Sequence, residues 1–156
     1  MLSLISLLLL TGMQQVLLYF KALNQHELQQ QRFYQMERLA SFLTQKKRSR
    51  ACLISAIGAE KVWRRLRTEK GCVLSLSYGR IYYFIEDLGA FPCLIASVAG
   101  KEFATHHTRV SLLLLEESQP EQFLQIRYLN PIIAFPCQEE KTKVNLGISS
   151  WRYVLK

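Results

Sequence analysis

The chain has 156 residues, a formal net charge of +8 and a hydrophobic content of 49%. Aromatic and β-branched residues are plentiful beyond residue 70, which argues against a disordered chain and allows one domain with its own core. The four cysteines form no C-x-x-C pair and have no histidine at metal spacing, so the pattern does not favour a zinc site.

Residues 1–20 form a predicted transmembrane segment. They read MLSLISLLLLTGMQQVLLYF and contain no charged side chain, and about 20 apolar residues are enough for a helix to cross a bilayer. A cleaved signal peptide has a basic start and a small-residue exit. The sequence shows neither feature before Lys21, so we expect an uncleaved anchor.

Small and polar residues interrupt this segment. Those that suit close packing of membrane helices are Ser3, Ser6, Thr11 and Gly12. Gln14 and Gln15 are costly in lipid unless they find a partner or lie near the interface. Two interpretations stay open: the last third of the span lies among the headgroups, with Tyr19 at the interface, or the glutamines face other helices in an assembly.

Residues 21–48 are predicted to continue the same helix, because no proline occurs before Pro92. An apolar stripe with the i, i+3, i+4, i+7 spacing of a helix face comprises Met36, Leu39, Ala40 and Leu43. Leu28 and Phe33 continue this stripe toward the N-terminus, although their spacing fits it only approximately. We therefore expect one helix over 1–48, which packs against its own domain in its last turns.

Residues 49–156 are predicted to form the globular domain. A short helix begins after Gly58, with Ala59, Val62, Trp63 and Leu66 facing inward. Period-two patterns then predict strands at 72–78, 80–86, 93–98, 108–115, 123–129 and 149–155, with residues 87–89 ending the second strand. The predicted fold class is α+β, a long helix packed on an antiparallel sheet.

The cysteines all follow the membrane segment, and their even number suggests disulfides in an oxidising compartment such as the periplasm. Of the three pairings that four cysteines allow, we favour Cys52–Cys72, which closes a short loop, and Cys93–Cys137, which joins two loops that contain proline. Buried free thiols are the alternative.

The positive charge is concentrated between residues 46 and 70. The cluster comprises Lys46, Lys47, Arg48, Arg50, Lys61, Arg64, Arg65, Arg67 and Lys70. It could attract DNA or anionic headgroups, or it could be a solvated face that pairs with acidic neighbours in an assembly. We favour the second interpretation, because Trp63 is the only aromatic residue in the stretch and DNA stacking platforms use several.

No pattern of residues indicates catalysis. His106 and His107 are adjacent, so on a strand they point to opposite faces and cannot share one metal; we expect both on the surface or in a loop. Glu86 and Asp87 are expected in a strand-ending turn, or in an ion pair with a nearby arginine. We expect no catalytic, cofactor-binding or metal-binding residues, since nucleophile and phosphate-loop motifs do not occur.

Several stretches resemble the type IV pilins, and in detail the PilX-like minor pilins and the type II secretion pseudopilins. These stretches are SLLLLTGMQQ (6–15), YYFIEDLG (82–89) followed by a cysteine, RVSLLL (109–114) and SWRYVL (150–155). The resemblance implies a pilin-like fold and a structural role in priming or assembling a type IV pilus in a Gram-negative bacterium. The alternatives are a minor pseudopilin and a membrane-anchored minor pilin that binds DNA.

The resemblance also implies partners and a location. The partners would be other minor pilins, the major pilin, a tip adhesin and the inner-membrane assembly platform, with the chain in the inner membrane before it enters the pilus. The working parts would be the assembly helix, the two disulfides and exposed loops near 99–107 and 116–122. Mature pilins have Glu at the fifth position after a cleaved leader, where this sequence has Ile5. We expect a leader upstream of residue 1; the alternative is a subunit that bypasses the peptidase.

Overall fold

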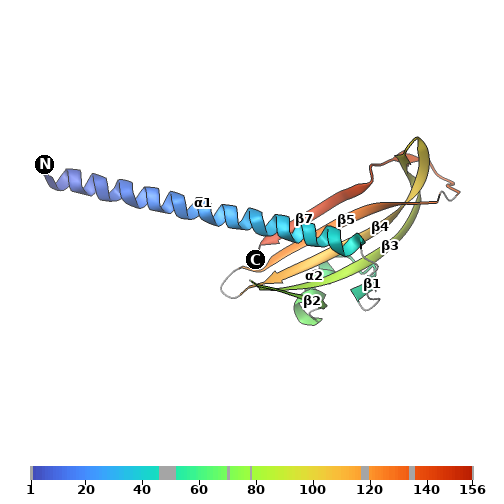
Figure 1. Cartoon of the computed structure of the whole chain (residues 1–156), viewed down its shortest axis with the longest axis horizontal. Coiled ribbons are helices and arrows are strands. Elements are labelled where there is room, and N and C mark those ends of the chain that lie inside the picture. Colours follow the sequence, from blue (N-terminus) through green and yellow to red (C-terminus); the bar gives the residue numbers. More distant parts are fainter. Residues whose placement is uncertain are drawn as a thin grey trace. The chain divides into compact units, whose positions relative to one another are not determined.

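The computed structural model describes residues 2–45, 52–69, 71–77, 79–116, 120–133 and 136–155. The chain divides into two compact units, Met1–Gln35 and Met36–Lys156. The described elements, shown in Figure 1, are α1 (Leu2–Gln45), β1 (Leu53–Ser55), α2 (Ala59–Glu69), β2 (Cys72–Leu76), β3 (Gly79–Val98), β4 (Lys101–Leu115), β5 (Gln122–Ile132), β6 (Thr142–Lys143) and β7 (Gly147–Leu155).

The helix α1 is continuous over its 44 residues, as the absence of proline and the abundance of leucine and glutamine predict. Within α1, the stretch Ser6–Thr44 is long and apolar enough to cross a membrane, judged by length and composition. Within this stretch, Leu28 is 46% exposed and Phe33 is half-buried. The predicted end at residue 48 lies outside the described residues.

The last turns of α1 belong to the core of the second unit. Met36, Ala40 and Leu43 are at most 1% exposed and Leu39 is half-buried, which confirms the apolar stripe. The Ser41 hydroxyl lies 3.0 Å from the hydroxyl of Tyr128 on β5. This part of the helix therefore packs against the sheet.

The strand β3 organises a mixed sheet with the order β1-β3-β4-β5-β7. One edge of β3 pairs with β4, β4 pairs with β5, and β5 pairs with β7, all antiparallel. Between β5 and β7 the chain crosses to the other edge of β3, where it forms β6. The other edge carries three short strands in succession: β2 antiparallel, then β1 and β6 parallel. The two parallel strands correct the expectation of a wholly antiparallel sheet.

A tight turn and two irregularities in pairing explain why β3 and β4 are longer than predicted. Val98 pairs with Lys101, and between them Ala99 and Gly100 have φ angles of 49° and 78°. Positive φ at both central residues is typical of a type I′ hairpin turn. The predicted exposed loop at 99–107 is thus this turn followed by strand.

The expected strand end at residues 87–89 is instead a β-bulge inside β3. The register with β4 shifts between Asp87 and Gly89. The Asp87 carboxylate accepts a hydrogen bond of 2.8 Å from the Gly89 N–H, and Gly89 has a φ of 87° that favours glycine. Turn-forming residues therefore bend this strand without ending it.

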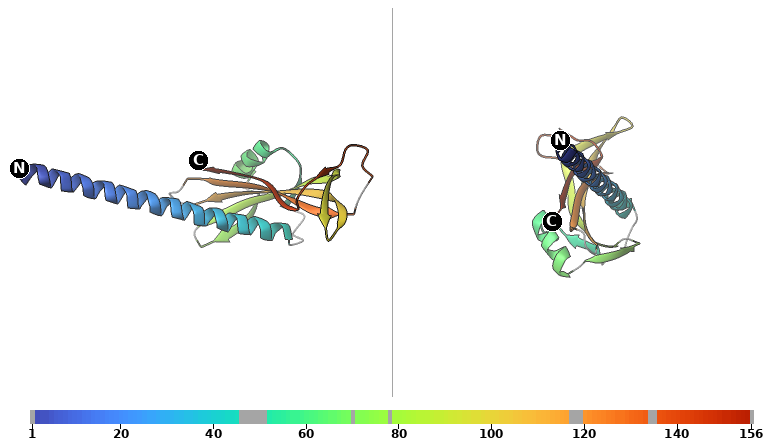
Figure 2. Two further views of the ribbon diagram at one scale, coloured as in Figure 1. Left: turned by 90° about the horizontal axis from the view of Figure 1, so that it is seen from above. Right: turned by 90° about the vertical axis from the view of Figure 1, so that its left-hand side faces the viewer.

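The sheet of the second unit is covered on both faces. Val62 and Leu66 of α2 pack with Tyr82, Phe84, Leu113 and Phe123 on one face, as the sequence predicted for α2. Tyr128, which contacts the end of α1, points to the other face because strand side chains alternate. Figure 2 shows α2 and the last turns of α1 on opposite sides of the strands. Runs of buried residues in β4 and β5 follow from this double cover.

The second predicted exposed loop, at 116–122, is also shorter than expected. Residues 117–119 lie outside the described residues, and Gln122 begins β5 with an exposure of only 1%. The Tyr153 hydroxyl donates a hydrogen bond of 3.0 Å to the Gln122 side-chain oxygen. The Gln122 side chain is therefore buried against β7 and is not part of an exposed loop that could contact a partner.

Candidate functional site

The structure joins Cys52 to Cys72 and Cys93 to Cys137, with Cα atoms 5.7 and 5.2 Å apart. This is the pairing favoured from the sequence. The first disulfide links β2 to the residue that precedes β1, so it fastens two of the short strands on the same edge of β3. The second links the irregular part of β3 to the segment that leads into β6.

Three predicted residues of the assembly helix lie in the apolar first part of α1, and all three are exposed. Gly12, Gln14 and Gln15 are exposed, and so are the large apolar side chains around them, from Leu7 at 61% to Phe20 at 63%. Such a continuous apolar surface is not stable in water without a cover. Lipid or other apolar helices satisfy this requirement.

The structure brings together only part of the predicted basic cluster. Lys46, Lys47, Arg48, Arg50 and Lys70 lie outside the described residues. Arg64 is exposed on α2, whereas the two other arginines of this helix contact side chains of the domain.

These two arginines are Arg65 and Arg67, and each contacts an aromatic ring. The Arg65 guanidinium lies 5.3 Å from the centre of the Phe84 ring. The Arg67 guanidinium lies 5.3 Å from the centre of the Trp63 ring, and its Nε lies 3.1 Å from a Glu121 carboxylate oxygen. Both arginines thus have partners within the domain: an aromatic ring for Arg65, and an aromatic ring and a carboxylate for Arg67.

A buried ion pair, which sequence reasoning only partly anticipated, crosses β3 and β4. Glu86 is fully buried, and Arg109 donates to both of its carboxylate oxygens, at 2.6 Å from Nε and 2.5 Å from Nη2. The Ile57 N–H adds a third hydrogen bond of 3.3 Å. An ion pair with an arginine was one expected role for Glu86, but its position in a turn was wrong, since Glu86 lies inside β3 opposite Arg109.

His107 is the second buried polar residue, and it was wrongly expected on the surface or in a loop. It is 2% exposed, its ring stacks on Phe91 with centroids 4.2 Å apart, and the Arg127 guanidinium contacts Nδ1. Burial, followed by the charges of Arg127 and His106, lowers the pKa of His107 to about 4. His107 is therefore neutral at pH 7.

The hydrogen bonds around His107 form a directed chain. Because the Arg127 guanidinium can only donate, Nδ1 accepts and Nε2 carries the ring proton. The Nε2–H then donates to the Thr105 hydroxyl at 3.0 Å, and this hydroxyl donates to the Leu94 carbonyl at 3.1 Å. The ring thus has no basic nitrogen left for proton abstraction, and the chain holds β3, β4 and β5 together.

His106 points to the opposite side of β4 from His107, as expected for adjacent strand residues. It is half-buried, and its Nε2 lies 2.9 Å from an Asp87 carboxylate oxygen. Across the described residues, no group of three or more His, Cys, Asp or Glu side chains could hold a metal ion.

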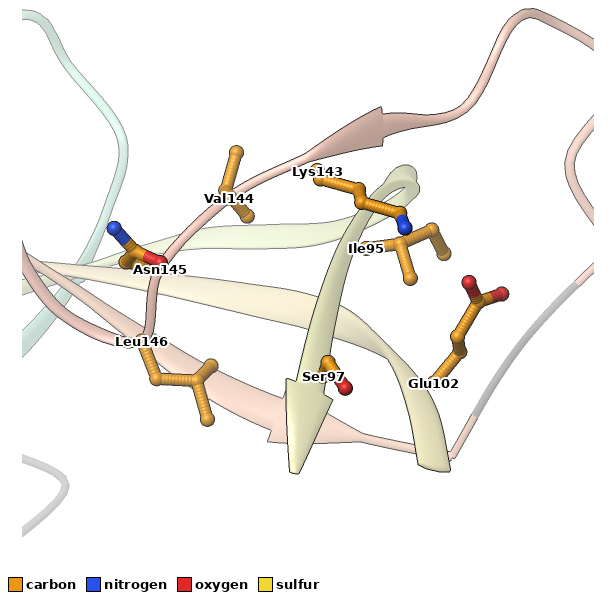
Figure 3. A pocket seen from close by; sticks show the side chains of 7 residues that line it. All are labelled: Ile95, Ser97, Glu102, Lys143, Val144, Asn145 and Leu146. Carbon is orange, nitrogen blue, oxygen red and sulfur yellow. The ribbon is translucent and has the colours of Figure 1, made fainter. Parts of the chain in front are cut away.

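A pocket of about 270 Å³ lies between the β3–β4 hairpin and the segment after β6. Figure 3 shows its lining side chains: Ile95, Ser97, Glu102, Lys143, Val144, Asn145 and Leu146. The Lys143 amine and the Glu102 carboxylate point toward each other in this view. The Val144 N–H donates to the Ile95 carbonyl at 2.9 Å, which ties the segment after β6 to β3. Ligand pockets are usually larger, at about 300–1,000 Å³, and mostly apolar. We therefore interpret this pocket as a gap between two packed segments and not as a ligand site.

Comparison of the chain with protein-family models, with curated proteins and with solved structures finds no match. The geometry of the chain itself is therefore the basis for a functional proposal.

Proposed function

We propose that the chain is a minor-pilin-like structural subunit, which its N-terminal helix anchors in the inner membrane and inserts into a type IV pilus. The observation that carries the proposal is the continuity of α1. The apolar surface of residues 7–20 and the buried residues Met36, Ala40 and Leu43 belong to one helix. A helix of this kind serves both as a membrane anchor and as part of the fold of the domain.

The composition of the two parts of the helix supports this dual role. Leu7–Phe20 exposes large apolar side chains and bears no charge, so lipid covers it before assembly and neighbouring helices cover it afterwards. Exchange of lipid for protein contacts needs no change in the sheet domain, whose core α2 covers on one face and the last turns of α1 cover on the other. The domain, cross-linked by two disulfides, is then free to contact neighbouring subunits.

The two disulfides support an oxidising location for the domain, which for an inner-membrane protein is the periplasm. The partners proposed on this basis are other minor pilins, the major pilin and the inner-membrane assembly platform. A role as a type II secretion pseudopilin, which the sequence resemblance also suggests, is the alternative function. DNA binding is less well supported, because Arg65 and Arg67 contact Phe84, Trp63 and Glu121 within the domain.

The test is deletion of the gene in its native host, followed by complementation with the wild-type chain or with Leu10→Arg. An arginine at the centre of the span costs about 3 kcal/mol of insertion free energy, so this variant should leave the membrane fraction and fail to restore surface pili. Gln25→Arg, which adds the same charge to the polar part of the helix, is the matched control and should restore them.

The readouts separate the two related machines. Loss of surface pili with normal protein secretion supports the pilus role, whereas the reverse supports the pseudopilin role. Normal pili and normal secretion in the deletion strain would refute both.

A further inference from the structure

Gln14 and Gln15 lie inside an apolar part of α1. The five residues that follow, Val16 to Phe20, are large, apolar and 54–67% exposed, and the first charged side chain is Lys21. At about 1.5 Å per residue, Gln15 is about 9 Å before Lys21, while half of the hydrocarbon core is about 15 Å thick. A span that ends at Lys21 therefore places both amides in hydrocarbon. Placing them among the headgroups would push five large apolar side chains out of the lipid.

The neighbouring Thr11 shows how a polar group is satisfied within the helix. Its hydroxyl donates to the carbonyls of Leu7 and Leu8, at 3.0 and 2.9 Å. The amides of Gln14 and Gln15 make no hydrogen bond to any residue that the structure describes. Each amide has two donors and an acceptor, and these are costly to leave unsatisfied in lipid. Thr11 needs no second chain, but the glutamines do.

The same side of the helix also allows a close approach. At about 100° per residue, Thr11 lies between Gln14 and Gln15 around the axis, and Gly12 completes an arc of about 160°. Apart from its two chain neighbours and the nearby helix backbone, no atom of the described residues lies within 4 Å of where a Gly12 Cβ would be. A small residue beside hydrogen-bonding side chains is the composition of helix contacts in membranes.

We propose that α1 pairs in the membrane with α1 of a second copy of this chain, through hydrogen bonds between the amides of Gln14 and Gln15. All copies insert in the same direction, so these amides lie at the same depth in every copy. An amide is both donor and acceptor and complements itself without an ion. The inference rests on the membrane-spanning role of α1 in the proposed function, and it names a partner for that helix.

The test measures association of the full chain in phosphatidylcholine vesicles. Copies that carry a donor or an acceptor fluorophore at the C-terminus are mixed, and energy transfer is followed as lipid dilutes the protein. The variants are Gln14→Leu/Gln15→Leu, which removes both amides, and Gln14→Asn/Gln15→Asn, which keeps them. Gln25→Leu is the matched control, because it makes the same change on the same helix beyond Lys21.

We expect the leucine variant to dissociate at a protein-to-lipid ratio roughly 5- to 30-fold higher than the wild-type chain. The asparagine variant and Gln25→Leu should stay close to wild type. A leucine variant that associates like wild type, or a wild-type chain that is monomeric at every ratio, would overturn the proposal. A chain that pairs through these amides but enters no pilus would refute the proposed function alone.

Discussion

The stability of the sheet domain should depend on pH through His107. The folded-state pKa of this residue is about 4, below the ordinary value of about 6.5. The unfolded chain therefore takes up the proton first as the pH falls. The stabilising contribution is complete above pH 6.5 and is lost between pH 6.5 and 4. With these two pKa values, the loss relative to pH 7.5 is about 2 kcal/mol at pH 5 and about 3 kcal/mol at pH 4.

Urea unfolding of the full chain in detergent micelles measures this loss. Tryptophan fluorescence, which comes from Trp63 at the edge of the α2 core and from Trp151 on β7, follows the sheet domain. The free energy of unfolding is determined at pH 7.5 and 5 for the wild-type chain and for His107→Gln. The variant has no titrating ring, so it should lose about 2 kcal/mol less than wild type over this interval.

The control is His26→Gln, which removes an exposed histidine from the first unit. This variant should keep the pH dependence of the wild-type chain. If wild type and His107→Gln lose the same stability between pH 7.5 and 5, the burial of a neutral His107 between Arg127 and Phe91 is not the cause.

Three further substitutions test the packing of the second unit by urea unfolding. Arg109→Met leaves the Glu86 carboxylate buried without its partner and should lower the free energy of unfolding by about 3–5 kcal/mol. The double variant Glu86→Gln/Arg109→Met should recover most of this loss. A small loss of stability in Arg109→Met alone would refute the buried ion pair. Leu43→Ala, at a position 1% exposed, should cost about 2–5 kcal/mol, whereas a loss under 1 kcal/mol would mean that the end of α1 is not core. Cys93→Ser/Cys137→Ser opens a link across 44 residues and should cost about 4 kcal/mol on the chain-entropy model, with unchanged stability as the contrary result.

Local patterns predicted the elements that depend on local sequence. The apolar spacing of Met36, Ala40 and Leu43 alone indicates the buried face of α1. The signal for α2 was similar, since Gly58 precedes an amphipathic run that buries Val62 and Leu66. Both helices follow from a period near 3.6 residues, which the sequence displays directly.

The lengths of β3 and β4 could not be predicted, because the same residue types form turns that end a strand and bulges within a continuing strand. Asp87 and Gly89 read as a turn, but they form a bulge that bends a continuing strand. Ala99 at positive φ is an unusual residue for a type I′ turn, so the true hairpin was less conspicuous than the bulge. Only the pairing partner distinguishes these two outcomes.

The buried polar residues depended on register, which the sequence does not specify. Glu86 and Arg109 are 23 residues apart and become opposite one another only through the β3–β4 pairing. A usable signal was present in TRVSLLLL, where Arg109 and Ser111 interrupt a strand that is otherwise apolar. Polar side chains in a strand covered on both faces must find partners inside the domain.

The measurement that most directly tests the central claim is photo-crosslinking from within the apolar part of α1. A photoreactive amino acid replaces Leu10 in the chain expressed in its native host, and adducts are identified by mass spectrometry after illumination. The account predicts adducts with pilin-like subunits of the same machine, through their own N-terminal helices. Adducts with lipid alone, in cells that assemble normal pili and secrete normally, would contradict it.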